Sequence, residues 1–499
     1  MNMISTMSWV PKGACKPVPV EADPPSVEEI EEMIVSGALQ HSDGGDEEQF
    51  DGELDDVADM VAEDSKDVES DVTQALSVAA ALGKTPKREA KFKDIADAMD
   101  DLDMEHYDDD DEDEVDLFSS GLGDLYYPSN EMDPNLNQND DNDDDSEDQD
   151  ALTIKPTDGV IVCAGTVDYL NHLEVWIVEE TETGEPNTYV HHEVLLSKIP
   201  LCTAWLDCPL KGGDKGNYIA VGTMGAEIEI FNLDVLHEVE PTLVLGGKIE
   251  KRKRKSEKKS VKYKKDSHTD AVLGLAWNKE YRNVLASASA DKLVKIWDMS
   301  TETCVTTMNH HTDKVQAAVW NPHDAQMILT GSFDHTVVMR DCKKLSECGS
   351  KWSIPADIES VAWDPHDSHS FVVSLKNGTV QGFDSRFASE TASTSQPTFT
   401  LHAHDGAVCS VSYNPSAPKL LATGSSDKTV KLWDLSNNQP SCLASRNPKA
   451  GKVFSLSFSV DIPHLLAIGG SKATLQVWNI LNEAGIARKF GSFLQPSRP

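Results

Sequence analysis

The amino-acid sequence predicts an all-β protein, a seven-bladed β-propeller interrupted near its N-terminus by a long, acidic, disordered insertion. Three observations carry this prediction: a recurring pair of aromatic positions, alternating strand patterns between turn residues, and a sharp division of charge along the chain. Units of about 40–45 residues that each hold four short strands are typical of propeller blades rather than of solenoids.

Two aromatic positions recur together in the C-terminal part of the chain. The first ends one alternating strand, and the second ends another strand 20 residues later. Successive units begin 43, 43, 50 and 45 residues apart, so a fixed block is joined by loops of variable length. The five pairs are Trp277 and Trp297, Trp320 and Arg340, Trp363 and Phe383, Tyr413 and Trp433, and Phe458 and Trp478.

Two looser units precede these five. Asn217–Leu233 repeats the strand-turn-strand pattern, with Trp205 and Phe231 at the two aromatic positions. An earlier hairpin ends near Trp176 and lacks its partner strand. The opening segment MISTMSWVPKG resembles VLGLAWNKE, with Trp9 at the first aromatic position. We therefore expect the missing strand of the first blade at the start of the chain, which brings the count to seven blades.

These assignments divide the chain into three parts. Residues 1–12 supply the first strand of blade one, residues 13–150 form the acidic segment, and residues 151–495 form the rest of the propeller. The closure of the ring is left open between two alternatives. Either a strand from the opposite terminus latches it, or Ala487–Leu494 completes the last blade.

Charge separates the acidic segment from the propeller. Residues 1–150 contain 46 Asp and Glu against 8 Lys and Arg, whereas the remaining residues contain 39 acids and 36 bases. Like charges and few apolar groups predict a mostly disordered segment, with short helices over Ser26–Leu39 and after Thr85. The segment is interpreted either as a solubilising spacer or as a docking arm for basic proteins such as histones or ribosomal proteins.

Several classes of protein are disfavoured by composition. The chain has neither an apolar run of membrane-spanning length nor a secretory pattern, so we expect a soluble intracellular protein without membrane contact. Its nine cysteines have neither zinc-ribbon nor redox spacing. We expect reduced thiols and no metal or cofactor.

A set of His, Ser or Thr, Asp and Trp recurs in the repeats and invites comparison with a catalytic triad. A triad occurs once in each active site, so recurrence indicates architecture, and we expect no enzyme and no small-molecule substrate. These positions resemble WD repeats, in which such residues form a buried hydrogen-bond chain; the predicted fold is a seven-bladed WD-repeat β-propeller. The sets are His268, Ser287, Asp291 and Trp297; His311, Thr330 and Asp334; and His404, Thr423, Asp427 and Trp433.

One loop between blades is strongly basic. Residues 248–265 contain 11 bases and two acids. Clustered cations serve nuclear import or phosphate contact, and import is the preferred hypothesis because the chain is expected to be soluble and intracellular with an otherwise near-neutral propeller. No aromatic stacking platform accompanies the loop. Contact with RNA remains an open alternative. The expected import residues are Lys251, Arg252, Lys253, Arg254 and Lys255.

The whole chain resembles the periodic tryptophan protein 1 family. The resemblance rests on MISTMSWVPKG, IKPTDGVIVCAG, NYIAVGTMGAEIEIFNLD, the basic loop before HTDAVLGLAWNKE, and HHTDKVQ, in that order. It implies a nucleolar factor in the nucleus, acting in ribosome biogenesis and pre-ribosomal RNA processing, with links to chromatin and ribosomal-DNA transcription. Three features depart from the WD pattern: Arg340 replaces a blade tryptophan, and Ile354-Pro355 and Asn377 replace the His and the turn Asp of one blade.

The resulting hypothesis is a non-enzymatic scaffold whose partners are pre-ribosomal or other basic nuclear proteins. Two alternatives stay open. One is a histone-binding chromatin adaptor. The other is a substrate receptor of a cullin-type ubiquitin ligase, because Phe383-Asp384-Ser385-Arg386 resembles the Asp-x-Arg motif of some WD-repeat receptors.

Overall fold

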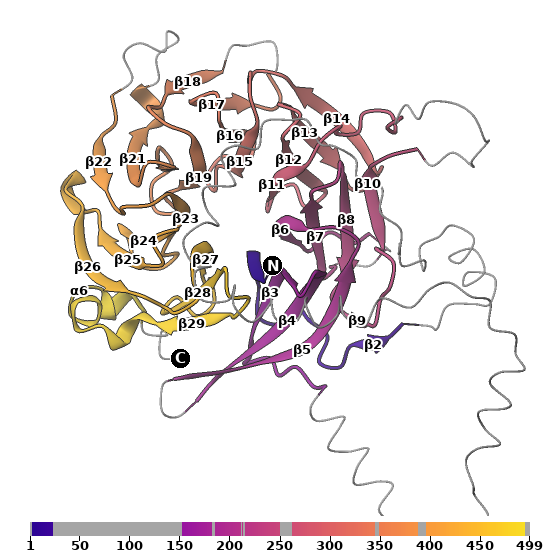
Figure 1. Cartoon of the computed structure of the whole chain (residues 1–499), viewed down its shortest axis with the longest axis horizontal. Helices are drawn as coiled ribbons and strands as arrows, with labels where there is room; N and C mark the ends of the chain where they lie inside the picture. Colours follow the sequence, from indigo (N-terminus) through magenta and orange to yellow (C-terminus); the bar gives the residue numbers. More distant parts are fainter. Residues whose placement is uncertain are drawn as a thin grey trace, which may run out of the picture. The chain divides into compact units, whose positions relative to one another are not determined.

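The computed structural model shows seven blades arranged as a ring (Figure 1). The two expected helices of the acidic segment and residues Lys251–Lys255 lie outside the residues that the structure describes. The described residues are 2–22, 152–181, 185–210, 212, 215–249, 262–344, 349–387 and 396–494.

Each blade is an antiparallel sheet, and the first strands of neighbouring blades contact one another around the ring. Blade 1 contains β1 (Met3–Val10), β3 (Gly159–Val167), β4 (Leu170–Glu180) and β5 (Pro186–Leu196). Blade 2 contains β6 (Pro200–Leu206), β7 (Tyr218–Thr223), β8 (Glu227–Asn232) and β10 (Leu243–Gly246). Blade 3 contains β11 (Val272–Trp277), β12 (Val284–Ser289), β13 (Val294–Asp298) and β14 (Thr303–Met308).

The next three blades repeat this order. Blade 4 contains β15 (Val315–Trp320), β16 (Met327–Ser332), β17 (Thr336–Asp341) and β18 (Ser350–Ser353). Blade 5 contains β19 (Ile358–Trp363), β20 (Ser370–Leu375), β21 (Thr379–Asp384) and β22 (Phe399–His402). Blade 6 contains β23 (Val408–Tyr413), β24 (Leu420–Ser425), β25 (Val430–Asp434) and β26 (Ser441–Arg446).

Blade 7 has three strands, β27 (Val453–Phe458), β28 (Leu465–Gly470) and β29 (Gln476–Asn479). Ala487–Leu494 belongs to helix α6 (Ala484–Leu494), so the expectation that it completes this blade as a strand is wrong. The segment is helical because its apolar residues Ile486, Phe490 and Leu494 recur at helical spacing and bury one face against the core of blades 6 and 7.

The N-terminal strand closes the ring inside blade 1. β1 pairs with β3, so the strand predicted at the start of the chain joins the sheet from which it was missing. Ile4 and Met7 are buried in a cluster that includes Leu465 and Ala467 of β28 in blade 7. Trp9 Nε1 also donates to the carbonyl of Ser457 in β27, at 3.0 Å. No strand exchanged between the termini is present in the described sheets, so the first alternative for closure is wrong as well.

The two ends of the acidic segment lie side by side on the propeller. The backbone N–H of Ile154 donates to the carbonyl of Pro17 at 2.7 Å. Beyond it, β2 (Val20–Glu21) pairs with β9 (Val235–Leu236), which follows the third strand of blade 2. The acidic segment is thus anchored at both ends at the boundary of blades 1 and 2.

Alternation of strand direction gives the ring two faces. The mouth face holds the loops after the first and third strands, such as residues 278–283. The turn face holds the turns between the second and third strands, such as residues 290–293, and the links between blades, such as residues 309–314. Lys12, just after β1, donates its backbone N–H to Asp461 in the loop after β27, so the chain leaves β1 on the mouth face.

Candidate functional site: closed polar networks and an aromatic channel mouth

In blade 3 the structure brings all four predicted residues together on the turn-face side of the blade. His268 Nδ1 lies 2.8 Å from Asp291 Oδ2, and His268 Nε2 lies 2.7 Å from Ser287 Oγ. Trp297 Nε1 donates to the same Ser287 oxygen at 2.8 Å. Ser287 and His268 are completely buried. A nucleophile must reach its substrate, so this set holds strands together and does not present a reactive hydroxyl.

Blade 6 repeats this arrangement. His404 lies 2.9 Å from Asp427 and 2.8 Å from Thr423, whose hydroxyl accepts from Trp433 Nε1 at 2.9 Å. Burial lowers the pKa of His404. Burial acts to raise the pKa of Asp427, but hydrogen bonds from Thr429 and the proximity of His404 outweigh it, so that pKa is lowered.

Blade 4 keeps the set although arginine stands at the tryptophan position. His311 lies 3.0 Å from Asp334 and 2.9 Å from Thr330. His310 Nε2 lies 3.0 Å from the same Thr330 oxygen, where the indole of blades 3 and 6 donates. Burial lowers the pKa of His310 to about 3, so it stays neutral at physiological pH. A second histidine thus replaces the missing tryptophan.

Two blades use other residues. In blade 5, Asn377 Oδ1 accepts from the backbone N–H of Thr379 at 3.1 Å and from its hydroxyl at 2.7 Å. In blade 1, Glu174 lies 3.0 Å from His172 and accepts from Trp176 Nε1 at 2.8 Å. Sequence reasoning missed the blade 1 set, although its signal was available: residues 172, 174 and 176 alternate along one strand and therefore share one face.

A second recurring network joins the blades on the mouth face. The residue after the first aromatic position is a buried Asn in three blades. Asn278 donates to Ala325 O at 2.7 Å, Asn321 to Ser368 O at 3.1 Å, and Asn414 to Pro463 O at 2.7 Å, each in the next blade. Each Asn oxygen also accepts backbone N–H groups of its own loop.

Sequence reasoning missed this network too. In blade 5 the position is Asp364, which lies 2.8 Å from Lys419 Nζ of blade 6. In blade 7 it is Ser459, which accepts the backbone N–H of Ile462 at 3.0 Å. The recurrence of Asn, Asp or Ser directly after the aromatic residue was the available signal.

The first aromatic positions line the mouth of the central channel. A cavity of about 920 Å³ opens there, and its walls come from the ends of five first strands. Trp320 Nε1 donates to Ala276 O at 3.0 Å, which fixes this indole against the preceding blade. The buried Nε1 of Trp363 has no hydrogen-bond partner among the described residues. The five aromatic wall residues are Trp277, Trp320, Trp363, Tyr413 and Phe458.

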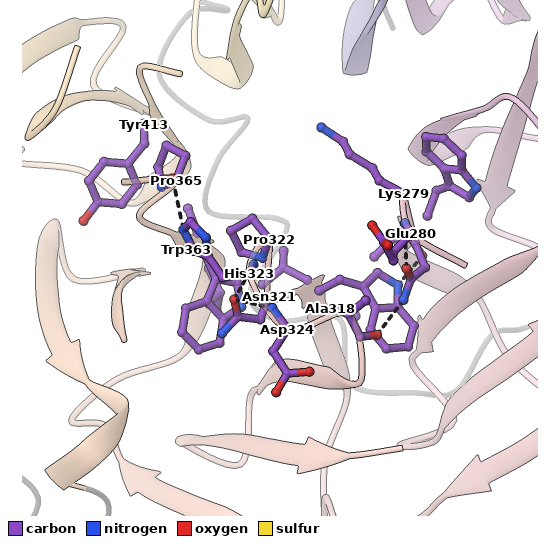
Figure 2. A pocket seen from close by; sticks show the side chains of 18 of the residues that line it. Lys279, Glu280, Ala318, Asn321, Pro322, His323, Asp324, Trp363, Pro365 and Tyr413 are labelled. Atoms are coloured by element: carbon purple, nitrogen blue, oxygen red, sulfur yellow. Dashed lines mark hydrogen bonds between the residues drawn. The ribbon is translucent and has the colours of Figure 1, made fainter. Parts of the chain in front are cut away.

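Polar side chains surround this mouth. Lys279, Glu280 and Asp324 are exposed on the loops that line it. His323 lies against the neighbouring loop, with its Nε2 3.1 Å from Pro365 O (Figure 2). The arrangement offers a partner two exposed carboxylates and the partly exposed rings of Trp277, Trp320 and Tyr413, without a nucleophile and base in contact with each other.

The described residues include metal-ligating and thiol side chains. They contain no cluster of three or more His, Cys, Asp or Glu that fits a metal ion. The cysteines among them are free thiols, and burial raises the pKa of Cys342 and of Cys409 to about 12, which disfavours the thiolate. No described helix is long and apolar enough to cross a bilayer.

A family model of known proteins matches three segments of this propeller. The family model described as WD domain, G-beta repeat matches residues 259–298, 302–341 and 395–434. These ranges contain the first three strands of blades 3, 4 and 6, the blades that contain the His, Ser or Thr and Asp sets. The match therefore follows the hydrogen-bond chemistry of the blades.

Three relatives extend the similarity over most of the chain. An uncharacterised WD-repeat protein of Schizosaccharomyces pombe is 37% identical over 464 residues, which cover 91% of this chain and 83% of the relative. Periodic tryptophan protein 1 of Saccharomyces cerevisiae is 29% identical over 508 residues, covering 90% of this chain and 82% of the relative. The Drosophila melanogaster periodic tryptophan protein 1 homolog is 28% identical over 289 residues, covering 57% and 59%.

Proposed function

Because this chain belongs to the periodic tryptophan protein 1 family of WD-repeat proteins, we propose that it is a non-enzymatic assembly platform for ribosome biogenesis in the nucleolus. One observation carries the proposal. Every His, Ser or Thr and Asp set that resembles a catalytic one is closed inside a blade. The channel mouth instead holds a cavity lined by the half-buried rings of Trp277, Trp320 and Tyr413 and by exposed polar loops. The buried polar sets hydrogen-bond strands within their blades, and the channel mouth remains as a surface for partners.

The acidic segment supplies the second half of the platform. Its N-terminal end leaves β1 on the mouth face, where Glu280 and Asp324 are exposed. Residues 1–150 carry 46 acids against 8 bases, which attract basic proteins such as ribosomal proteins or histones. The described residues next to this segment, Val20–Glu21 and Ile154, attach it to the propeller on both of its sides in the sequence. Pre-ribosomal RNA processing and a role in ribosomal-DNA chromatin are part of the same proposal.

The geometry of the Asp384-Ser385-Arg386 motif does not support the ligase-receptor alternative. Arg386 Nη2 lies 2.6 Å from Asp384 Oδ2, and Arg386 Nε lies 3.0 Å from Asp384 Oδ1. The arginine is 59% exposed and its guanidinium is already paired within the motif. An ion pair of this kind stabilises the loop after β21 and is common on protein surfaces.

Affinity purification from cells tests the proposal against this alternative. Tagged wild-type chain, Arg386→Ala and the control Arg488→Ala, an exposed arginine of α6, are compared by quantitative mass spectrometry. We expect ribosome assembly factors with all three chains. Recovery of a ligase adaptor with the wild type and the control, but not with Arg386→Ala, overturns the platform in favour of the receptor.

A further inference from the structure

The turn face presents lysines at a strained backbone position. Lys292 and Lys428 occupy the same place in the turns of blades 3 and 6, with φ of 72° and 70°. This left-handed region favours glycine or asparagine, and other residues adopt it at a cost of about 1 kcal/mol or more. Both lysines are exposed, and neither forms an ion pair within the described residues. His335 has the same conformation, with φ of 60°, in blade 4.

More cations gather on the same face. Lys314, Lys449 and Lys472 are exposed in the links and the turn that follow around the ring. The described ends of the basic loop also lie on this face, since they belong to the link between β10 and β11, and they pair with each other. Ile249 N–H donates to Lys262 O at 2.7 Å, and Lys264 N–H donates to Gly247 O at 2.9 Å. The described ends of this loop, Lys248 and Lys262–Lys265, therefore lie on the turn face between blades 2 and 3.

Part of the negative charge on this face is withdrawn from solvent. Asp291, Asp334 and Asp427 each lie within 3.0 Å of a buried histidine. Residues 151–499 are almost neutral, with 39 acids and 36 bases. Asp168, Asp266, Asp270 and Asp405 remain exposed on this face, but its exposed lysines outnumber them, so the face keeps an excess of positive charge.

An exposed aromatic residue completes this face. Tyr169 is at the tip of the β3–β4 turn in blade 1, is 87% exposed, and has φ of 70°. Its neighbour Leu170 is 61% exposed. A bulky side chain at positive φ is an outlier, and a tyrosine that fills no core is free to stack with a ligand. Blade 1 thus brings an exposed tyrosine to the same face as the described ends of the basic loop.

We propose that the turn face binds single-stranded RNA, with lysines of several blades contacting phosphates and Tyr169 stacking on a base. Proteins that bind single strands combine a cationic track with aromatic side chains, and this face has both. RNA fits this face better than an acidic protein does, because base stacking uses the flat exposed ring of Tyr169 in addition to the lysine charges. The proposal goes beyond the protein-assembly function, since it adds a nucleic-acid surface opposite the channel mouth.

Binding of fluorescent single-stranded 20-nucleotide RNA to the purified full-length chain tests the proposal. We expect Kd to rise steeply with salt. Tyr169→Ala should weaken binding by roughly 5- to 100-fold, the usual effect of losing one stacked base. The triple change Lys292→Gln, Lys428→Gln and Lys472→Gln should lower the salt slope by about 2, since each lost phosphate contact removes about 0.7.

Matched variants on the mouth face serve as controls. Tyr281→Ala and the triple change of Lys279, Lys343 and Lys344 to Gln should leave the affinity and the salt slope near wild type. Unchanged melting of every variant shows that the ring is intact. Loss of binding in both sets of lysine variants would mean non-specific attraction and overturn the proposal.

Two further outcomes also overturn it. One is the absence of RNA binding by the wild type at low salt. The other is equal competition by polyglutamate combined with full affinity of Tyr169→Ala, which would assign the face to an acidic protein. Since the assay uses the purified chain alone, a negative result leaves the assembly function standing, and a failure of that function leaves the RNA result intact.

Discussion

Removing two side chains from the N-terminal strand should open the ring. Ile4 is 2% exposed and Met7 is 6% exposed, and both pack between β3 of blade 1 and β28 of blade 7. Methyl groups of Ile4 and Met7 lie against the backbone of Gly469, where even an added Cβ would meet them at 2.6 and 2.7 Å. The double variant Ile4→Ala and Met7→Ala therefore removes side chains that pack between the first blade and the last.

The expected loss of stability is large. A buried Ile or Met changed to Ala costs about 2–5 kcal/mol, because apolar burial is lost and a cavity remains. The two sites are neighbours, so their effects need not add. Even a combined loss of about 4 kcal/mol is a large share of the ~5–15 kcal/mol that typically keeps a domain folded. We expect a lower urea midpoint, a lower melting temperature and early aggregation.

Calorimetry at a fixed scan rate and urea titration measure this effect. The matched control is Met224→Ala with Ile249→Ala, which removes the same two side-chain types at positions 58% and 46% exposed. The control should melt within a degree or two of wild type, since surface changes usually alter stability by less than about 0.5 kcal/mol each. If the Ile4 and Met7 variant melts like this control, the N-terminal strand does not close the ring and the topology argued above is wrong.

Four other changes have definite expected outcomes. Stability should fall as the pH drops from 6.5 toward 4, because burial, with repulsion from His191 and His237, lowers the pKa of His192 to about 4, whereas the unfolded chain takes up this proton near the ordinary pKa of 6.5. In urea titrations over this range, His192→Gln should reduce the dependence of the unfolding free energy on pH. An unchanged dependence would assign the effect to another group. Asn414→Ala should cost about 1–3 kcal/mol in urea unfolding, because it leaves Pro463 O and two backbone N–H groups without a partner; a neutral result means that water replaces it. Excision of residues 40–84 should leave the melting temperature nearly unchanged, since shortening a long loop alters its closure entropy by only ~0.4 kcal/mol, and a large drop would show that the segment packs on the ring. Replacing Lys251–Lys255 by Ala should shift a fluorescent fusion toward the cytoplasm, and undiminished nuclear signal would remove the import role from this loop.

The repeating aromatic positions made the fold predictable. A constant separation of 20 residues between Trp277 and Trp297, and between their counterparts, specifies the first and third strands of each blade. Periodicity could even place Trp9 across the acidic segment, because a blade without its first strand leaves backbone hydrogen bonds unmade. The His, Ser or Thr and Asp sets were predictable for the same reason, since recurrence marks residues that every blade needs.

The rest depends on contacts between distant parts of the chain. The Asn278 amide reaches Ala325 in the next blade, a pairing that no local pattern specifies. Tyr169 stands at an ordinary turn in the sequence, and only the closed ring brings it to the same face as Lys248 and Lys262, the described ends of the basic loop. The segment Ala487–Leu494 near the C-terminus is long enough to form either a strand or a helix. Burial of Phe490 against the core decides for the helix.

Sedimentation in a density gradient tests the assembly function most directly. Extract from cells that express the tagged chain at its normal level is separated, and the fractions are probed for the chain, for pre-ribosomal RNA and for histones. We expect that a substantial fraction of the protein migrates with pre-ribosomal particles, and that high salt, which weakens electrostatic contacts, releases it from them. Exclusive migration as a free monomer of 54.6 kDa, away from both particles and chromatin, would contradict it.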